Sequence, residues 1–172
     1  SKDGGPRFRP DAYMTDYLAR EAANAILANK NRPFFLYLAF NAPHTPLQAL
    51  KSDYDALVRI ADPRLRTYAA MIRALDRGVG TVLEALRANG LEENTLVLFT
   101  SDNGAPDYVG LEGLNRPWRG WKMTFFEGGI RAPFFARWPG VIPAGSKLDS
   151  PVAHIDIFPT LCDLVGLPAP EH

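Results

Sequence analysis

The chain has 172 residues, of which 47% are hydrophobic and 22% charged, which is the balance of an ordinary globular domain. Lysine and arginine together number 19, as do aspartate and glutamate, so the formal net charge is zero. This balance argues against nucleic-acid binding, which usually requires a basic excess. No apolar run reaches the roughly 18 residues that a membrane-spanning helix needs, and a single cysteine excludes a disulfide within the chain.

Two long helices are predicted on either side of a strand in the first half of the chain. Apolar side chains recur at helical spacing over residues 11–30 and again over residues 65–89. Gly90 follows the second run, at a position where a glycine commonly ends a helix. Between the helices, residues 34–40 form a continuous apolar run, which predicts a strand that is buried on both faces.

The second half of the chain predicts two further strands and a short helix. Residues 95–100 and 133–138 have the length and apolarity of strands, and residues 155–165 have a helical pattern. Strands that alternate with helices predict an α/β fold, with a mainly parallel sheet flanked by helices. His44 and Asp102 each follow the carboxyl end of a predicted strand, which is the edge of such a sheet where binding sites form.

The Asp102-Asn103 pair is a candidate metal site. Its carboxylate and amide oxygens are the hard ligands that calcium or magnesium prefers. Gly104 would let the backbone turn sharply, so that both side chains reach one cation. An Asp-Asn-Gly sequence is also a common turn signal that needs no metal. One carboxylate holds a divalent cation weakly, so a metal site would need further ligands from elsewhere.

Two cationic side chains are candidates for binding an anion. His44 lies between two prolines that restrict its backbone, and its imidazole could donate to an anionic oxygen or protonate a leaving group. The alternative is a loop histidine bonded to the backbone. Lys122 is either a fixed positive charge for an oxyanion or a surface lysine whose stem rests on aromatic rings. Its neighbours in the sequence are Trp118, Trp121, Phe125 and Phe126.

Other residues have simpler interpretations. Glu127-Gly128-Gly129 is typical of a tight turn. His154 is expected to support the last helix, and Cys162 is expected to be a buried core thiol. Three arginines near Lys122 are expected to be surface or structural residues: Arg116, Arg119 and Arg131.

Several motifs agree in order and spacing with one known family. They are Ala42-Pro43-His44-Thr45-Pro46, Ser101-Asp102-Asn103-Gly104, Arg119-Gly120-Trp121-Lys122, Phe126-Glu127-Gly128-Gly129 and Trp138-Pro139-Gly140. Together they resemble the formylglycine-dependent, arylsulfatase-like sulfatases of the alkaline phosphatase superfamily. The resemblance covers nearly the whole chain from about Tyr13 onward.

The resemblance implies a calcium-dependent sulfuric ester hydrolase. Asp102 and Asn103 match two ligands of a single Ca²⁺ ion, while Lys122 and His44 match catalytic residues that also bind the sulfate of the substrate. In the family, the nucleophile is a hydrated formylglycine, which a formylglycine-generating enzyme makes from Cys or Ser. The substrate would be a sulfated small molecule or glycan. The complete protein would be periplasmic, extracellular or lysosomal.

The sequence departs from the family at the nucleophile. The formylglycine precursor motif is Cys or Ser, any residue, Pro or Ala, any residue, Arg, and no position in this sequence matches it. Residues 1–172 are therefore expected to be part of a single sulfatase catalytic domain that is inactive alone, with the N-terminal nucleophile region and the C-terminal subdomain absent. Residues 108–118 are candidates for lining the substrate pocket.

Two alternatives to a sulfatase remain open. The first is a phosphonate monoester or phosphodiester hydrolase of the same superfamily, which activity on paired sulfate and phosphate esters would reveal. The second is a sulfatase-like domain that binds sulfated glycans without turnover, which would lack the precursor motif throughout the complete protein.

Overall fold

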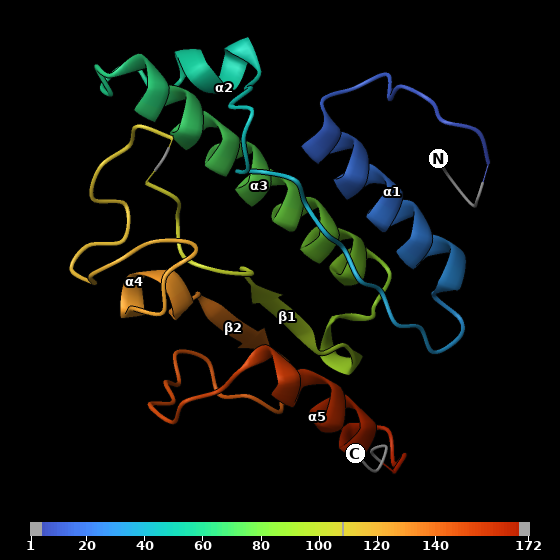
Figure 1. The fold of residues 1–172 in the computed structure, drawn as a ribbon. Helices are drawn as coiled ribbons and strands as arrows, with labels where there is room; N and C mark the ends of the chain where they lie inside the picture. Colours follow the sequence, from blue (N-terminus) through green and yellow to red (C-terminus); the bar gives the residue numbers. More distant parts are fainter. Residues whose placement is uncertain (1–4, 108, 169–172) are drawn as a thin grey trace. The chain divides into compact units, whose positions relative to one another are not determined.

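The computed structural model describes residues 5–107 and 109–168, and the chain divides into two compact units, Ser1–Ile142 and Pro143–His172. The first unit contains α1 (Met14–Asn29), α2 (Lys51–Asp55), α3 (Pro63–Ala88), the 3₁₀ turn η1 (Glu92–Asn94), β1 (Val97–Thr100), α4 (Glu127–Ile130) and β2 (Phe134–Arg137) (Figure 1). The second unit contains η2 (His154–Asp156) and α5 (Ile157–Leu164). The three predicted helices and the last two predicted strands are thereby confirmed.

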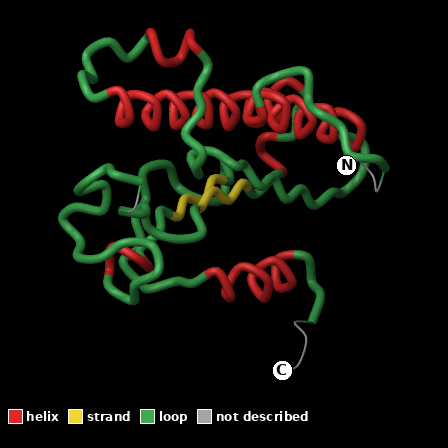
Figure 2. Tube along the Cα trace, turned by 45° about the horizontal axis from the view of Figure 1, so that its top comes forward, coloured by secondary structure: helices red, strands yellow, loops and turns green. Residues whose placement is uncertain are grey.

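The core of the first unit lies between α1 and α3, which pack side by side (Figures 1 and 2). Their facing positions carry small side chains, among them Ala19 and Ala22 on α1 and Ala70 and Ala74 on α3, all at most 3% exposed. Small residues let two helix backbones approach closely while their larger neighbours interlock. The sequence pattern predicts the helices from their large apolar residues, whereas the close contact depends mainly on these alanines.

The start of α3 illustrates how the sequence sets a helix boundary. The carboxylate of Asp62 accepts a hydrogen bond from the backbone N–H of Leu65 at 2.6 Å, and Pro63 occupies the first helical position. An aspartate cap satisfies an amide that would lack a partner at a helix start, and proline lacks that amide. The helix therefore begins at Pro63, two residues earlier than the apolar pattern alone predicts.

A cluster of charged side chains joins α1, α2 and α3. Arg77 of α3 donates to both carboxylate oxygens of Asp53 on α2, at 2.7 and 2.9 Å, and to Asp16 on α1 at 3.0 Å. Arg73 adds a third hydrogen bond to Asp53 at 3.1 Å. The Asp53 side chain is only 3% exposed, and the Arg77 guanidinium holds the pKa of its carboxyl below the usual range. This pairing fixes α2 against α3.

The sheet within the described residues consists of β1 and β2, which pair antiparallel. Val97 lies opposite Arg137, and Thr100 lies opposite Phe134. The described residues therefore contain both helices and strands, but the mainly parallel sheet that the sequence predicts is not seen among them. The alternation of elements indicates their types, whereas the direction of pairing depends on which strands become neighbours.

The predicted strand at residues 34–40 does not form among the described residues. This segment has no strand assignment and runs as extended chain across α3 (Figure 1). Phe35 and Tyr37 are 77% and 82% exposed, so the apolar run is not buried on both faces. The reason is that no described strand lies beside it to pair with its backbone. The ring of Phe40 does reach α3, where it lies 3.2 Å from the place that a Cβ at Gly78 would occupy.

The second unit is short and is described by itself. The carboxylate of Asp156 accepts a hydrogen bond from the backbone N–H of Ala153 at 2.7 Å, at the start of η2, and α5 follows directly. Cys162 is buried on α5, as the sequence predicts, and His154 lies in η2 just before that helix. Across the described ranges of both units, no helix combines the length and the apolarity that crossing a membrane requires.

The buried carboxylate of Asp53 gives a stability prediction. Asp53→Asn in the complete protein is expected to lower the free energy of unfolding by about 1–3 kcal/mol, because it removes the negative partner of two arginines. Urea unfolding near pH 7 measures this difference. Since the native pKa of Asp53 is lowered, its stabilisation is present above the ordinary aspartate pKa of about 3.9 and is lost as the pH falls below it. The gap between wild type and variant should therefore shrink from pH 5 downward.

A matched control is available on the exposed face of α3. Glu84 pairs with Arg87 at 2.6 Å, but both side chains are more than half exposed. Glu84→Gln should change the free energy of unfolding much less than Asp53→Asn does, because solvent screens such pairs. An equal effect of the two substitutions would contradict the special role of Asp53.

Candidate functional site

The segment after β1 presents two oxygen-bearing side chains. β1 ends at Thr100, and Asp102 follows two residues later with an exposed carboxylate that forms no hydrogen bond or ion pair with any described residue. The Asn103 side chain donates from Nδ2 to the carbonyl of Gly104 at 3.0 Å. That bond orients the amide and leaves Oδ1 without a donor in the described part of the chain. Both side chains thus keep oxygens available for a cation.

Gly104 has a different function from the sharp turn that the sequence suggests. Its backbone N–H donates to the carbonyl of Gly129 at 2.9 Å, and a Cβ at Gly104 would lie only 1.8 Å from the carbonyl oxygen of Gly128. A Cβ at Gly128 would in turn lie 2.3 Å from the Gly120 oxygen. Glycine is needed at positions 104 and 128 because backbone segments meet there. The reason is not a left-handed backbone, since neither Gly104 nor Gly128 has a positive φ.

The same contact explains the glycine pair in Glu127-Gly128-Gly129. The sequence predicts a tight turn, but these residues form the short helix α4. Both glycines are buried, and a Cβ at Gly129 would lie 2.1 Å from the carbonyl oxygen of Thr124. The glycines therefore let α4 pack directly on the loops around it.

A backbone bond and an asparagine fix the loop of Lys122 against the loop of Asp102. The N–H of Lys122 donates to the carbonyl of Ala105 at 3.2 Å. The Asn115 amide bonds both backbone groups of Ala105, at 2.8 Å each, and donates to the Gly120 carbonyl at 3.3 Å. The sequence does not reveal this function of Asn115, because an asparagine among glycines and prolines indicates only a loop. The two loops are thus one connected structure.

The ammonium group of Lys122 is left for other partners. The side chain is half-buried, and its Nζ forms no hydrogen bond or ion pair with the described residues. Two of the four aromatic rings that the sequence places around it, those of Phe126 and Trp118, are paired with arginines instead. Arg119 lies over the ring of Phe126 at 4.0 Å, and Arg131 lies over Trp118 at 4.1 Å while also pairing with Glu127. The structural interpretation of these two arginines is confirmed.

The residue after Lys122 has an unusual backbone conformation. Met123 has φ of 79°, the left-handed region that residues with a Cβ rarely adopt, and its side chain is exposed. The residue before it, Lys122, donates its backbone N–H to the carbonyl of Ala105. The residue after it, Thr124, donates its backbone N–H to the carbonyl of Trp121 at 2.9 Å. This tight turn sets the position of Lys122, and strain of this kind is often found at functional sites.

His44 lies in an exposed turn on a separate segment. Its backbone N–H donates to the Asn41 carbonyl at 2.9 Å, and its Nδ1 lies 2.7 Å from the Thr45 carbonyl. A carbonyl only accepts, so Nδ1 carries the proton and Nε2 is the ring atom that stays available. The backbone-bonded histidine that the sequence leaves open is therefore present, and it preserves one free nitrogen. In the described part of the chain, no hydrogen bond or ion pair joins His44 with Asp102, Asn103 or Lys122.

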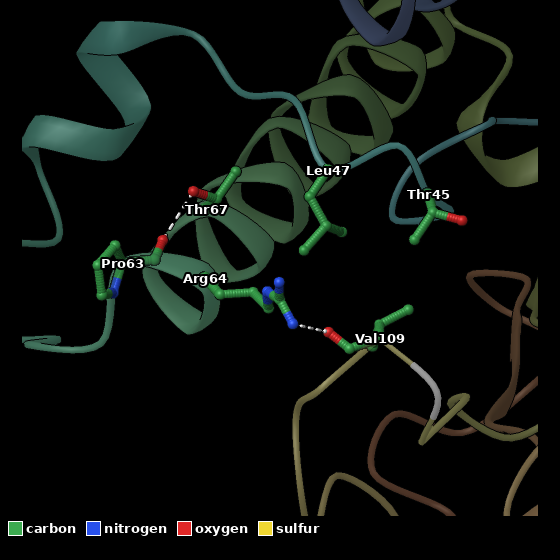
Figure 3. A pocket seen from close by; sticks show the side chains of 6 residues that line it. All are labelled: Thr45, Leu47, Pro63, Arg64, Thr67 and Val109. Carbon is green, nitrogen blue, oxygen red and sulfur yellow. Dashed lines mark hydrogen bonds between the residues drawn. The ribbon is translucent and has the colours of Figure 1, made fainter.

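A hollow of about 560 Å³ lies beside the His44 turn (Figure 3). Three segments line it: the turn and its continuation, the start of α3, and the loop that follows Asn103. Its lining residues are Thr45, Leu47, Pro63, Arg64, Thr67 and Val109. Residues 108–118 were candidates for a pocket lining, and Val109 does line this hollow, whereas Tyr108 lies outside the described residues. The hollow thus brings the His44 turn and the loop after Asn103 to one place.

Asp102 and Asn103 carry the oxygen atoms that a cation prefers, but they are only two residues. Asp102 and Asn103 offer two oxygen ligands, whereas a calcium ion takes six to eight. Among the described residues there is no group of three or more His, Cys, Asp or Glu side chains that could hold a metal ion. The pair therefore fits a cation chemically but does not complete its coordination.

The chain is similar in sequence and in structure to known proteins. A family profile described as Sulfatase matches residues 1–167. The steryl-sulfatase of Rattus norvegicus is 37% identical over 91% of this chain and 27% of that protein, and the N-acetylgalactosamine-6-sulfatase of Canis lupus familiaris is 37% identical over 94% and 30%. The structure of Ps i-CgsB in complex with k-i-k-neocarrahexaose superimposes with a TM-score of 0.92 and 42% identity, over 97% of this chain and 37% of that one.

The profile match extends over almost the whole chain, and the similar proteins carry sulfatase names. The chain belongs to the sulfatase family. It spans about a third of the length of the relatives and the structure that it matches, with shares of 27%, 30% and 37%.

The contact between the two loops gives a prediction that does not depend on activity. Gly104→Ala in the complete protein is expected to push the loops apart, because its Cβ cannot occupy the space next to the Gly128 carbonyl. We expect a loss of about 1–3 kcal/mol in the free energy of unfolding. Amide hydrogen exchange should accelerate in the peptide that contains Lys122, whose N–H bonds across the contact.

The control substitution is Gly80→Ala in α3. Apart from its chain neighbours and the backbone of its own helix, no described atom lies within 4 Å of a Cβ at Gly80, and the residue is helical. Alanine should raise the free energy of unfolding there by up to about 1 kcal/mol. Unchanged exchange around Lys122 in the Gly104→Ala protein would show that the two loops are positioned independently.

Proposed function

We propose that the protein hydrolyses a sulfate monoester and that Asp102, Asn103, Lys122 and His44 form part of its active site. The observation that carries this proposal is the connection between the two loops. The bonds from Gly104 to Gly129 and from Lys122 to Ala105 hold the Asp102 loop and the Lys122 loop together. A pair of oxygen ligands and an unpaired ammonium on one connected structure suit an ester whose oxygens carry negative charge.

The oxygen atoms of Asp102 and Asn103 would hold a calcium ion, together with ligands from outside this sequence. Such an ion would supply a positive charge for the sulfate oxygens. Asn103 is prepared for this function because its Nδ2 is bonded to the Gly104 carbonyl, which leaves Oδ1 as the ligand atom.

Lys122 and His44 would act on the two ends of the bond that breaks. The ammonium group of Lys122 would bind a sulfate oxygen, in a position set by the turn at Met123. His44 would use Nε2, in its protonated form, to give a proton to the departing alcohol oxygen, while Nδ1 remains bonded to Thr45. In this scheme the turn of His44 orients the imidazole and leaves one nitrogen for the reaction.

The nucleophile would be a formylglycine from a part of the protein outside this sequence, since no Cys or Ser here matches the precursor motif. A formylglycine-generating enzyme would then be a partner during maturation. Residues 1–172 would form part of one catalytic domain. Residues 34–40 would become a strand of a mainly parallel sheet once further strands pair with them, which would also cover Phe35 and Tyr37. The protein would act in the periplasm, outside the cell or in a lysosome.

The substrate class that we propose is a sulfated carbohydrate. Ps i-CgsB is 42% identical to this chain, and its structure contains an oligosaccharide, k-i-k-neocarrahexaose. The N-acetylgalactosamine-6-sulfatase is also named for a sugar substrate. Carbohydrate hydroxyl groups fit the open, partly polar hollow beside the His44 turn.

Paired esters test the reaction. The complete, matured protein is expected to hydrolyse sulfated oligosaccharides and an aryl sulfate, with kcat/KM at least about a hundredfold above that for the corresponding phosphate esters. Chelation should abolish the activity, and added Ca²⁺ should restore it. Faster hydrolysis of the phosphate esters would identify a phosphonate or phosphodiester hydrolase, and binding of sulfated glycans without any turnover would identify a binding domain.

Substitution of Lys122 tests its function in catalysis. Lys122→Ala is expected to lower kcat/KM for a sulfate ester by about 10²–10³, because it removes a fixed positive charge from the site. Lys122→Arg should also be poor, since a planar guanidinium does not replace a compact ammonium. The fold should be retained, because the Nζ atom contacts no described partner.

Arg119→Ala is the neighbouring control. Its guanidinium lies over Phe126, so its loss should affect packing and cost less activity than the loss of Lys122. If Lys122→Ala remains nearly fully active while His44→Ala and Asp102→Ala do not, Lys122 is a structural residue.

A further inference from the structure

The hollow beside the His44 turn contains a charged side chain that the proposed reaction does not use. Arg64, at the second position of α3, extends across the hollow toward Val109 (Figure 3). The remaining walls are largely apolar, with Leu47 and Pro63 among them, and the Thr67 hydroxyl is bonded to the Pro63 carbonyl at 2.8 Å. Arg64 is therefore the group in this lining that can recognise charge.

The charge of Arg64 is not neutralised by the described residues. No carboxylate among them pairs with it, in contrast to Arg87, which pairs with Glu84. Within the described residues, its guanidinium forms one hydrogen bond, from Nη1 to the carbonyl of Val109 at 2.8 Å. A guanidinium has five N–H donors, so four remain for a ligand. A planar fork with free donors matches the oxygens of a sulfate or a carboxylate.

The guanidinium is held in place before any ligand binds. The bond from Arg64 to Val109 connects two segments that are 45 residues apart in the sequence. Gly110 provides the room for it, because its φ is +70° and a Cβ there would lie 2.2 Å from Nη1 of Arg64. An arginine that is already fixed loses less conformational freedom when it binds an anion.

The position of the hollow indicates what the anion belongs to. Thr45, the residue after His44, lines the same hollow as Arg64. A group bound there would be connected to the alcohol side of the ester, since His44 is the proposed donor to the departing oxygen. We infer that Arg64 binds a second anionic group, a sulfate or a carboxylate, on the sugar that carries or adjoins the reacting ester. This inference rests on the proposed function and narrows its substrate to multiply anionic oligosaccharides.

The test compares three oligosaccharides that all carry the reacting sulfate and differ in one group at the adjacent position. The first has no second anion there, the second has a sulfate, and the third has a carboxylate. In the complete, matured protein, Arg64→Gln should lower kcat/KM for the doubly anionic substrates by about 10–100-fold, chiefly through KM. It should change the singly sulfated substrate less than about twofold. Arg59→Gln, an exposed arginine without a described partner, is the control and should affect neither.

A second substitution moves the guanidinium without removing it. Gly110→Ala places a Cβ where Nη1 of Arg64 lies, so it should weaken selectivity for the second anion in the same direction. Calorimetric binding of the same oligosaccharides to wild type and Arg64→Gln gives a readout without turnover.

The outcomes separate the two proposals. If wild type hydrolyses no sulfate ester but binds the doubly sulfated oligosaccharide more tightly through Arg64, the catalytic proposal fails and the subsite remains. If Arg64→Gln changes all substrates equally, or none, in both turnover and binding, the second anion subsite is excluded.

Discussion

The candidate site depends on the direct contact between the backbone at Gly104 and the backbone at Gly128 and Gly129. A Cβ at Gly104 would overlap the Gly128 carbonyl oxygen across this contact, and Cβ atoms at Gly128 and Gly129 would overlap carbonyl oxygens of the Lys122 loop, those of Gly120 and Thr124. Because the two backbones do meet, the loop with the oxygen ligands and the loop with Lys122 form a single structure, which Asn115 reinforces through Ala105. The glycines therefore contribute by letting the two backbones come close together. This contact in turn sets the positions of the polar side chains beside them.

The helical part of the chain serves a complementary purpose. The close packing of α1 on α3 and the pairing of Arg77 with Asp53 and Asp16 hold the first half of the chain as one body. The segment that carries His44 runs from α1 to α2 across α3, so its two ends are anchored on that body (Figure 1). The start of α3 then contributes Arg64 to the hollow beside this segment. The helices that form the core thus also hold residues from distant parts of the sequence close to one another at this hollow.

Two features of the structure agree with the chain's short span relative to its relatives. The proposed calcium ion would find only two ligands in Asp102 and Asn103, and the apolar side chains of Phe35 and Tyr37 lie exposed on an extended segment. Both would be completed by additional chain, because a cation needs more ligands and an extended apolar segment needs neighbouring strands. The shares of 27–37% of the matched proteins are consistent with such completion.

The sequence by itself determined α1, α3, α5, β1 and β2 and the candidate residues, whereas α2 and α4 were not predicted. Helical spacing predicts α1 and α3, apolar runs predict β1 and β2, and the motifs around His44, Asp102 and Lys122 indicate the family, because all of these signals are local in the chain. Only the tertiary structure decided the antiparallel pairing of β1 with β2, the role of Asn115, the burial of Asp53 and the position of Arg64. Each of these depends on contacts between segments far apart in the sequence, for example the 45 residues between Arg64 and Val109. A local pattern records which conformation a segment prefers, whereas such contacts depend on how closely two folded segments can approach.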